Sequence, residues 1–220
     1  CQPPSVFQPV VQWEWHGSPV EPTFRNVWMT PIVANMTDDN ADGVIDENDV
    51  PDVLVVTFDR LPITAPNESE PGILRVLSGD DGHEHFSVLA PRIAESAQLA
   101  VGDIDGDGFP EIIASKWTVT PTTGTGIGGF EGRYTEGRLV ALDHLGHQLW
   151  ESEPYAWPSS VLWNASAPVL ADLDADGFSE IILGREVFDH RGRILWRGQG
   201  SLGLTQAGPN SVVADIDLDG

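Results

Sequence analysis

The chain has 220 residues, of which 34 are acidic and 11 are lysine or arginine, giving a formal net charge of −23. This charge argues against a nucleic-acid-binding protein, because such proteins need clustered basic residues. The apolar content of 40% excludes a disordered acidic tail and suffices for a hydrophobic core. No apolar run approaches the ~20 residues that cross a bilayer, so we expect no transmembrane segment.

About half of the acidic residues fall in four short clusters, so the acidity is mostly a local feature. Local clusters of carboxylates commonly hold a cation. The chain has a single cysteine, Cys1, and therefore no intrachain disulfide. A first-position cysteine is typical of a bacterial lipoprotein after signal-peptide removal, but it is also consistent with the start of a fragment. A lipid anchor at Cys1 is therefore one of two interpretations.

The first element in chain order is residues 11–15 (VQWEW), which alternate in the manner of a strand. This segment resembles the aromatic strands described below, but nothing before it could complete its sheet. We therefore predict that residues 1–29 form an N-terminal segment whose strand completes another sheet.

The first acidic cluster covers residues 35–52 and matches a twelve-residue calcium loop, with Gly43 at position six. An EF-hand would flank this loop with helices and usually end it with Glu, whereas residues 53–56 (VLVV) are typical of a strand. We interpret the cluster as an expanded hairpin loop and leave open a second ion in it. The candidate ligands are Asp38, Asn40, Asp42, the carbonyl of Val44, Asp46, Asp49 and Asp52.

Two later clusters share one spacing, with carboxylates at positions one, three, five and nine, and glycine at position six. Glycine tolerates the positive φ of a sharp turn, so the alternate side chains can converge on one point. An apolar Ile-Ile pair follows each cluster. A further copy breaks off at Gly220. The candidate ligands are Asp103, Asp105, Asp107, the Phe109 carbonyl and Glu111; Asp172, Asp174, Asp176, the Phe178 carbonyl and Glu180; and Asp215, Asp217 and Asp219.

Such carboxylates need a cation to hold them together. Like charges ~4 Å apart repel by about 4 kcal/mol at an effective dielectric of 20. Calcium prefers a cage of about 6–8 oxygen ligands, whereas magnesium demands a tight octahedron and keeps its waters. Three matched loops therefore predict several Ca²⁺ sites.

A glycine turn entering an aromatic strand also recurs, at residues 80–86 (DDGHEHF), 144–150 (HLGHQLW) and 190–196 (HRGRILW). A strand-like run precedes each turn, at residues 73–77, 139–142 and 186–188. The turns carry His83, His85, His144, His147 and His190, and their repetition favours a structural role over a surface metal site.

One unit therefore reads as strand, aspartate loop, strand, connection, strand, glycine turn and aromatic strand. This order predicts an all-β fold of four-stranded antiparallel sheets, the blades of a β-propeller. We predict approximate blades at 30–92, 93–156 and 157–203, and the start of the next at 204–220. Closed propellers have about 4–8 blades, so three blades and part of a fourth leave the ring incomplete in this chain.

The repeated DxDxDGxx[DE] loops of residues 30–220 resemble those of FG-GAP/VCBS repeats, the blades of integrin-α-like propellers. Residues 167–168 (AP) and 207–209 (AGP), each before a loop strand, add to the likeness. The resemblance implies calcium binding and a location outside the cell or on its outer surface. It implies partners among surface proteins, glycans and matrix components.

We find no catalytic motif, so we predict a non-catalytic module for adhesion or structural assembly. Self-association that completes the propeller, including polymerisation, is part of this prediction. A glycan-binding lectin is one alternative, in which Trp117, Trp157 and Trp163 would stack on sugars. A propeller polysaccharide lyase is another, although it needs a basic residue facing a uronate, and Lys116 is the only lysine.

Overall fold

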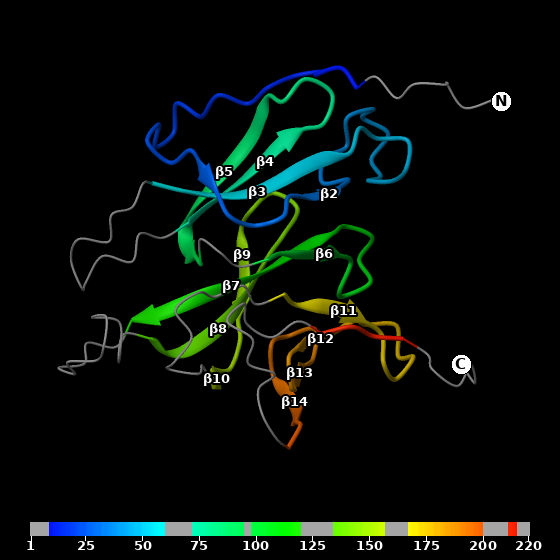
Figure 1. Ribbon diagram of the computed structural model, residues 1–220. Helices are drawn as coiled ribbons and strands as arrows, with labels where there is room; N and C mark the ends of the chain where they lie inside the picture. The colour runs from blue at the N-terminus through cyan, green and yellow to red at the C-terminus, as the bar shows by residue number, and fades with distance from the viewer. Residues whose placement is uncertain are drawn as a thin grey trace, which may run out of the picture.

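The computed structural model describes residues 9–59, 72–94, 98–119, 134–156, 167–199 and 211–214. Within these residues the regular structure consists of three antiparallel sheets, and no helix occurs (Figure 1). No helix of the described chain is therefore long and apolar enough to cross a membrane. The predicted all-β fold is confirmed.

The three sheets are built from consecutive strands of the chain. The first sheet contains β1 (Asn26–Val27), β2 (Ile32–Ala34), β3 (Asp52–Phe58), β4 (Gly72–Ser78) and β5 (Glu84–Ile93). The second contains β6 (Ala100–Gly102), β7 (Glu111–Val119), β8 (Tyr134–Leu142), β9 (Gln148–Glu151) and β10 (Tyr155–Ala156). The third contains β11 (Val169–Ala171), β12 (Glu180–Leu183), β13 (Glu186–Phe188) and β14 (Ile194–Arg197).

Each sheet repeats one meander of four strands, namely β2 to β5, β6 to β9 and β11 to β14. The short strands β1 and β10 pair in addition with β3 and β8. The predicted order of strands, aspartate loop and glycine turn is thus confirmed in all three sheets. The division into blades at the stated residues and their closure into a propeller stay predictions.

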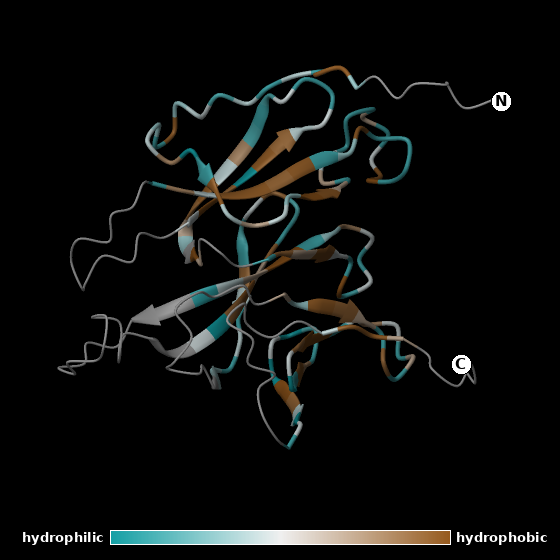
Figure 2. Cartoon of the chain, viewed as in Figure 1, coloured by the Kyte–Doolittle hydropathy of each residue, from teal (hydrophilic) through white to brown (hydrophobic). Residues whose placement is uncertain are grey.

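The middle sheet is covered on both faces, which explains the consecutive apolar residues 112–114 of β7 and 139–142 of β8. Ile112 and Leu142 belong to a core shared with β3 and β4, whereas Ile113 and Leu139 belong to a core shared with β12 and β13. Successive residues of β7 therefore pack against different neighbouring sheets. Figure 2 shows the hydrophobic residues concentrated in these strands and the hydrophilic ones in the loops.

Residues 11–15 pair with no strand among the described residues. A strand needs a neighbouring strand for its backbone hydrogen bonds, and the part of the chain that the structure describes offers none at this place. Trp13 nevertheless lies against the first glycine turn, where its Nε1 donates to the carbonyl of Gly79 at 2.8 Å. The segment's role in another sheet stays a prediction.

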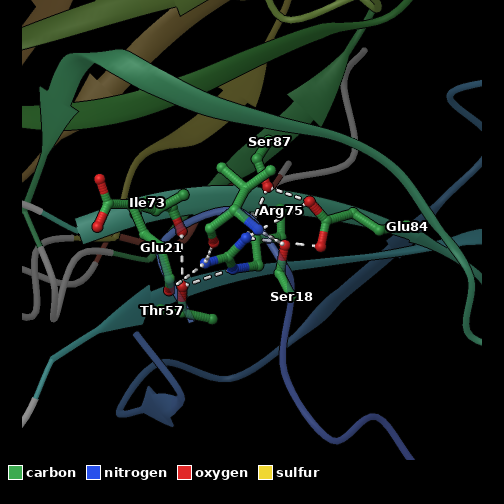
Figure 3. Close-up of polar contacts among 8 residues, drawn as sticks. Ser18, Glu21, Thr57, Ile73, Arg75, Glu84 and Ser87 are labelled. Carbon is green, nitrogen blue, oxygen red and sulfur yellow. Dashed lines mark hydrogen bonds and ion pairs between the residues drawn. The ribbon is translucent and has the colours of Figure 1, made fainter. Parts of the chain in front are cut away.

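Arg75 ties the N-terminal segment to the first sheet (Figure 3). This fully buried side chain of β4 donates from Nε to Thr57 Oγ1 at 2.9 Å and from Nη1 to Ser87 Oγ at 2.7 Å. Its Nη2 donates to the Val20 carbonyl at 2.9 Å. Burial lowers the pKa of Arg75, and the charge of Glu84 opposes that shift. Sequence reasoning missed this arginine, although a charged residue inside an apolar strand was a signal for it.

The turn glycines set the spacing between sheets. A Cβ atom at Gly192 would lie 2.7 Å from the Trp150 ring of the preceding sheet, and its φ is +76°. A Cβ atom at Gly146 would likewise lie 2.8 Å from Phe86. No side chain fits at these contacts without displacing the aromatic ring. The glycines therefore allow the turn of one sheet to approach the last strand of the sheet before it.

We expect Gly192→Ala to destabilise the fold more than Gly177→Ala does. Gly177 has a φ of +92° with no atom within 4 Å of the added Cβ, so both variants carry the strain of a positive φ. Only Gly192→Ala adds overlap with Trp150, which should cost about 1–3 kcal/mol more. Urea unfolding in the presence of a chelator measures the difference, and equal losses would contradict the contact.

Candidate metal sites in the aspartate loops

The aspartate loops join the first strand of each sheet to the second. All three lie on the same side of the molecule, at the right in Figure 1. The second strands begin with acidic residues that face the last residue of the first strands in the pairings Ala34–Asp52, Gly102–Glu111 and Ala171–Glu180. The sheet register thus places one carboxylate at the base of every loop.

The loop of the second sheet is held by hydrogen bonds from its own backbone. Asp103 accepts from the N–H groups of Gly106 at 2.7 Å and Gly108 at 3.0 Å. At the base, Glu111 Oε2 accepts from the N–H of Ile104 at 2.9 Å. These bonds curl the loop, which brings the side chains of Asp103 and Asp105 near Glu111.

The third sheet repeats this geometry. Asp172 accepts from the N–H groups of Asp176 at 3.1 Å and Gly177 at 3.0 Å. At its base, Glu180 Oε2 accepts from the N–H of Leu173 at 2.8 Å. The same fold of the loop at two places in the chain reflects the shared spacing of its acidic and glycine residues.

Each of these loops brings three carboxylates together. Oxygen atoms of Asp103, Asp105 and Glu111 all lie within 4.8 Å of one another, and so do those of Asp172, Asp174 and Glu180. Two oxygens on opposite sides of a calcium ion lie about 5 Å apart, at twice the bond length. A donor set made of carboxylates alone suits a hard cation, and the arrangement can therefore hold one ion per loop.

The position-five aspartates lie outside these groups of three. Asp107 instead accepts from the N–H of Phe109 at 2.8 Å, and Asp176 from that of Phe178 at 2.9 Å. Their role as ligands stays a prediction, as does that of the two phenylalanine carbonyls. Asp215, Asp217 and Asp219 lie outside the described residues, as do Cys1, Trp157, Trp163 and the side chain of Trp117.

The loop of the first sheet contains one such turn and two closing carboxylates. Asp38 accepts from the N–H groups of Asp42 at 3.1 Å and Gly43 at 2.8 Å, as Asp172 does in its loop. Asp49 accepts from Asp39 at 3.0 Å, in the manner of Glu111 and Glu180. Further in, Asp52 accepts from Met36 at 3.0 Å. The loop thus has an outer turn closed by Asp49 and a base closed by Asp52.

The other predicted side chains of the first loop also bond to its backbone. Asn40 Oδ1 accepts from Asp42 at 2.9 Å, and Asp46 Oδ1 accepts from Asn48 at 2.8 Å. Unlike the two later loops, this fully described loop brings no three carboxylates within the same short range. The ligand roles of its residues, including the Val44 carbonyl, stay predictions.

Asp52 has a partner that the sequence did not indicate. Its Oδ1 lies 2.9 Å from Nε2 of His85, and Asp52 has no exposed surface. Burial raises the pKa of Asp52, while the Met36 hydrogen bond and the charge of His85 oppose that shift. The pair fastens the base of the first loop to β5.

Burial raises the pKa of Glu111 to about 7. The hydrogen bond from Ile104 opposes the shift, and the charges of Asp105, Asp107 and Asp103 add to it. A bound cation would reverse this balance, because it favours the ionised carboxylate.

The loops of neighbouring sheets also touch each other. The N–H of Ser179 donates to the carbonyl of Ile104 at 3.1 Å, and Ile104 in turn donates to Glu111. The backbone of one residue, Ile104, therefore connects the base of the second loop to the residue before Glu180. Sequence reasoning could not find this contact, because it joins main-chain groups of two separate repeats.

Aromatic stacking connects each of these loops to the glycine turn of its own sheet. Phe109 stacks on His144 with ring centroids 4.7 Å apart, and Phe178 stacks on His190 at 4.5 Å. This contact supports the structural role expected for the two histidines. The repeated phenylalanine at position seven was the available signal.

Comparison with known proteins gives partial matches. No family model matches the chain, and no curated protein does. Among solved structures it is similar to the biofilm matrix protein Bap1 of V. cholerae, with a TM-score of 0.50 and 26% identity over 86% of this chain and 34% of that one. The chain thus spans about a third of Bap1.

Two rhamnogalacturonan lyases also match. YesW gives a TM-score of 0.47 at 19% identity, and the PL11 lyase of Bacillus licheniformis gives 0.46 at 20%. Each match covers 76% of this chain and 30% of the lyase. The names of these neighbours do not identify FG-GAP/VCBS repeats, so that resemblance stays a prediction.

In metal-free buffer, we expect stability to fall as the pH rises from 4.5 to 7. The unfolded Glu111 ionises near 4.5, whereas the folded one keeps its proton up to a pKa of about 7. The folded state therefore binds more protons in this window, and the loss reaches at most about 3 kcal/mol. Urea unfolding at pH 5 and pH 8 measures it.

The neutral variant Glu111→Gln should flatten this pH dependence. Glu14→Gln, which changes an exposed carboxylate, is the control and should retain it. A Glu111→Gln protein whose stability still falls by the same amount would contradict the assignment.

Proposed function

We propose that the chain is part of an extracellular calcium-binding β-propeller, built of FG-GAP/VCBS-like blades, that serves adhesion or structural assembly without catalysis. The observation that carries the proposal is the pair of equivalent carboxylate groups, Asp103 with Asp105 and Glu111, and Asp172 with Asp174 and Glu180. Both groups lie in the loop between the first and second strands of their sheets. This equivalence is typical of an ion site that each structural repeat carries.

The propeller arrangement is supported by the stacking of the sheets. Three meanders of the same order lie face to face, and each boundary has its own hydrophobic core. The first strands β2, β6 and β11 are neighbours across these boundaries. In a propeller the blades stand around a central channel, and such a row of strands would line it.

Calcium is supported by the chemistry of the donors. The grouped ligands are carboxylates, and Glu111 is buried, so an uncompensated negative charge there is costly. Calcium sites of extracellular modules bind at about 10⁻⁴–10⁻³ M, and cytosolic calcium would leave them empty. A location outside the cell therefore fits the proposed use of the ion.

Adhesion or assembly is supported by the likeness to Bap1, which is named as a biofilm matrix protein. The likeness covers most of this chain but only a third of Bap1. We therefore infer only the chemical class of the partner. We propose a matrix polysaccharide or a cell-surface protein. A lipid anchor at Cys1 would place the module on the outer surface.

Calcium should raise the melting temperature. At ten times the dissociation constant, each site adds about 1.4 kcal/mol, or roughly 3–6 °C for a chain of this size. The double variant Asp105→Asn with Asp174→Asn keeps one side-chain oxygen at each position but removes one charge per site, and should lose most of the rise. Asp80→Asn, at an exposed turn position, is the control and should retain it.

A scanning calorimetry experiment with calcium, with magnesium and with a chelator makes this comparison. A melting temperature that is the same in all three would contradict the ion sites. A rise with magnesium alone would contradict the choice of calcium.

The proposed role is tested by retention on immobilised acidic and neutral matrix polysaccharides with and without calcium. We expect calcium-dependent retention and no change in the polysaccharide. Release of unsaturated sugar products would instead show a lyase, and would contradict the non-catalytic role.

A further inference from the structure

His83 and His85 lie side by side where the chain enters the last strand of the first sheet. They flank Glu84, the first residue of β5, and their rings meet edge to face with centroids 4.4 Å apart. Two imidazoles bound to one metal ion at neighbouring positions have ring centres about 4.5–5 Å apart, given metal–nitrogen bonds of about 2.0–2.1 Å. The pair is thus already close to the spacing that a shared ion would impose.

Each of the two rings has a carboxylate at one of its nitrogens. Nδ1 of His83 lies 2.7 Å from Oδ1 of Asp81, and Nε2 of His85 lies 2.9 Å from Oδ1 of Asp52. A carboxylate beside one ring nitrogen favours the proton on that nitrogen and leaves the other nitrogen as an acceptor. Histidines that bind metal ions are commonly held in this way, by a carboxylate at the nitrogen that does not bind the ion. The nitrogens left for an ion are therefore Nε2 of His83 and Nδ1 of His85.

The first glycine turn does not need an imidazole at position 83. The backbone N–H of His83 donates to Asp81 at 2.9 Å. In the third sheet the equivalent residue is an arginine, and the N–H of Arg193 donates likewise to Asp189 at 2.8 Å. An arginine thus serves the turn as well as a histidine does, so the turn does not account for the side chain of His83.

Position 85 does not need an imidazole either. His85 is the extra residue of a β-bulge between β4 and β5. The bulges of the other two sheets have Leu149 and Leu195 at this place, which are 49% and 53% exposed. The side chain of His85 is only 15% exposed, because it faces the buried Asp52. A bulge redirects a side chain, and here it directs an imidazole toward a fixed carboxylate.

The donor atoms decide which ions suit this place. Imidazole nitrogen suits zinc, nickel and copper ions, whereas calcium takes oxygen ligands. The side chain of His83 is 55% exposed, so an ion can reach the pair from solvent, and water can complete its coordination. The net charge of −23 attracts cations to the surface in general.

We propose that His83 and His85 together bind one divalent transition-metal ion. Nε2 of His83 and Nδ1 of His85 would be its protein ligands, while the two carboxylates hold the rings. The proposal goes beyond the proposed function and does not depend on the calcium sites. A bound ion would join the first glycine turn to the base of the first aspartate loop, because His85 faces Asp52 there.

Calorimetric titration of the untagged full chain with zinc chloride tests the proposal, in excess calcium so that the aspartate loops are occupied by calcium where they bind it. We expect one zinc site that the variant His83→Asn weakens by at least about tenfold, since even the loss of an outer partner of a ligand costs that much. The side chain of His83 is exposed, and its turn bond comes from the backbone, so this variant should fold normally.

The second sheet supplies a matched control. His147 occupies the same turn position as His83, and its Nδ1 lies 3.0 Å from Asp143 Oδ2, but Leu149 stands where the first sheet has His85. His147→Asn should therefore leave the zinc affinity unchanged. Equal weakening by both variants would show that zinc binds single surface histidines, and would overturn the proposal.

Imidazole ¹⁵N NMR of the histidine-labelled chain identifies the ligand atoms. We expect zinc to shift Nε2 of His83 and Nδ1 of His85 and to leave His147 in place. His85→Leu, which introduces the residue found at the other two bulges, should abolish the shift of His83. If His85→Leu does not fold, His83→Asn decides.

An unchanged zinc affinity in His83→Asn, or zinc shifts confined to other histidines, would overturn the proposal. The calcium sites are judged separately. A zinc site that His83→Asn weakens, in a chain whose melting temperature is indifferent to calcium, would support the histidine site while contradicting the calcium sites.

Discussion

The structure depends on a carboxylate at the first residue of the second strand of every sheet. Asp52, Glu111 and Glu180 each accept a hydrogen bond from a loop N–H, and all three are buried. A buried carboxylate without compensation is costly, and further acidic groups nearby increase the cost. The fold therefore contains a local instability that a bound cation would remove.

Contacts between sheets transmit this stabilisation along the chain. A cation in the loop would fix its position-seven phenylalanine, which stacks on the histidine of the glycine turn, as Phe178 does on His190. The same turn contacts the last strand of the preceding sheet through Gly192 and Trp150. The proposed ion in one sheet would thus stiffen the boundary with the sheet before it.

The repeats could be predicted from the sequence because they are local patterns. The spacing of Asp172, Asp174 and Glu180 predicted a converging loop, and the glycine turns predicted hairpins, since both depend on neighbouring residues alone. The partner of Asp52 was not predictable, because His85 reaches it only after three strands have paired. The Arg75 contacts and the bond from Ser179 to Ile104 likewise arise from tertiary packing.

Residues 11–15 show the difference between an alternating pattern and a paired strand. Alternation indicates which face of a segment is buried, but a strand forms only where another strand supplies hydrogen bonds. Trp13 satisfies the first condition by packing on Gly82, and the described chain does not satisfy the second. Trp196 meets the second condition but not the first, because its strand β14 pairs with β13 while its side chain is mostly exposed.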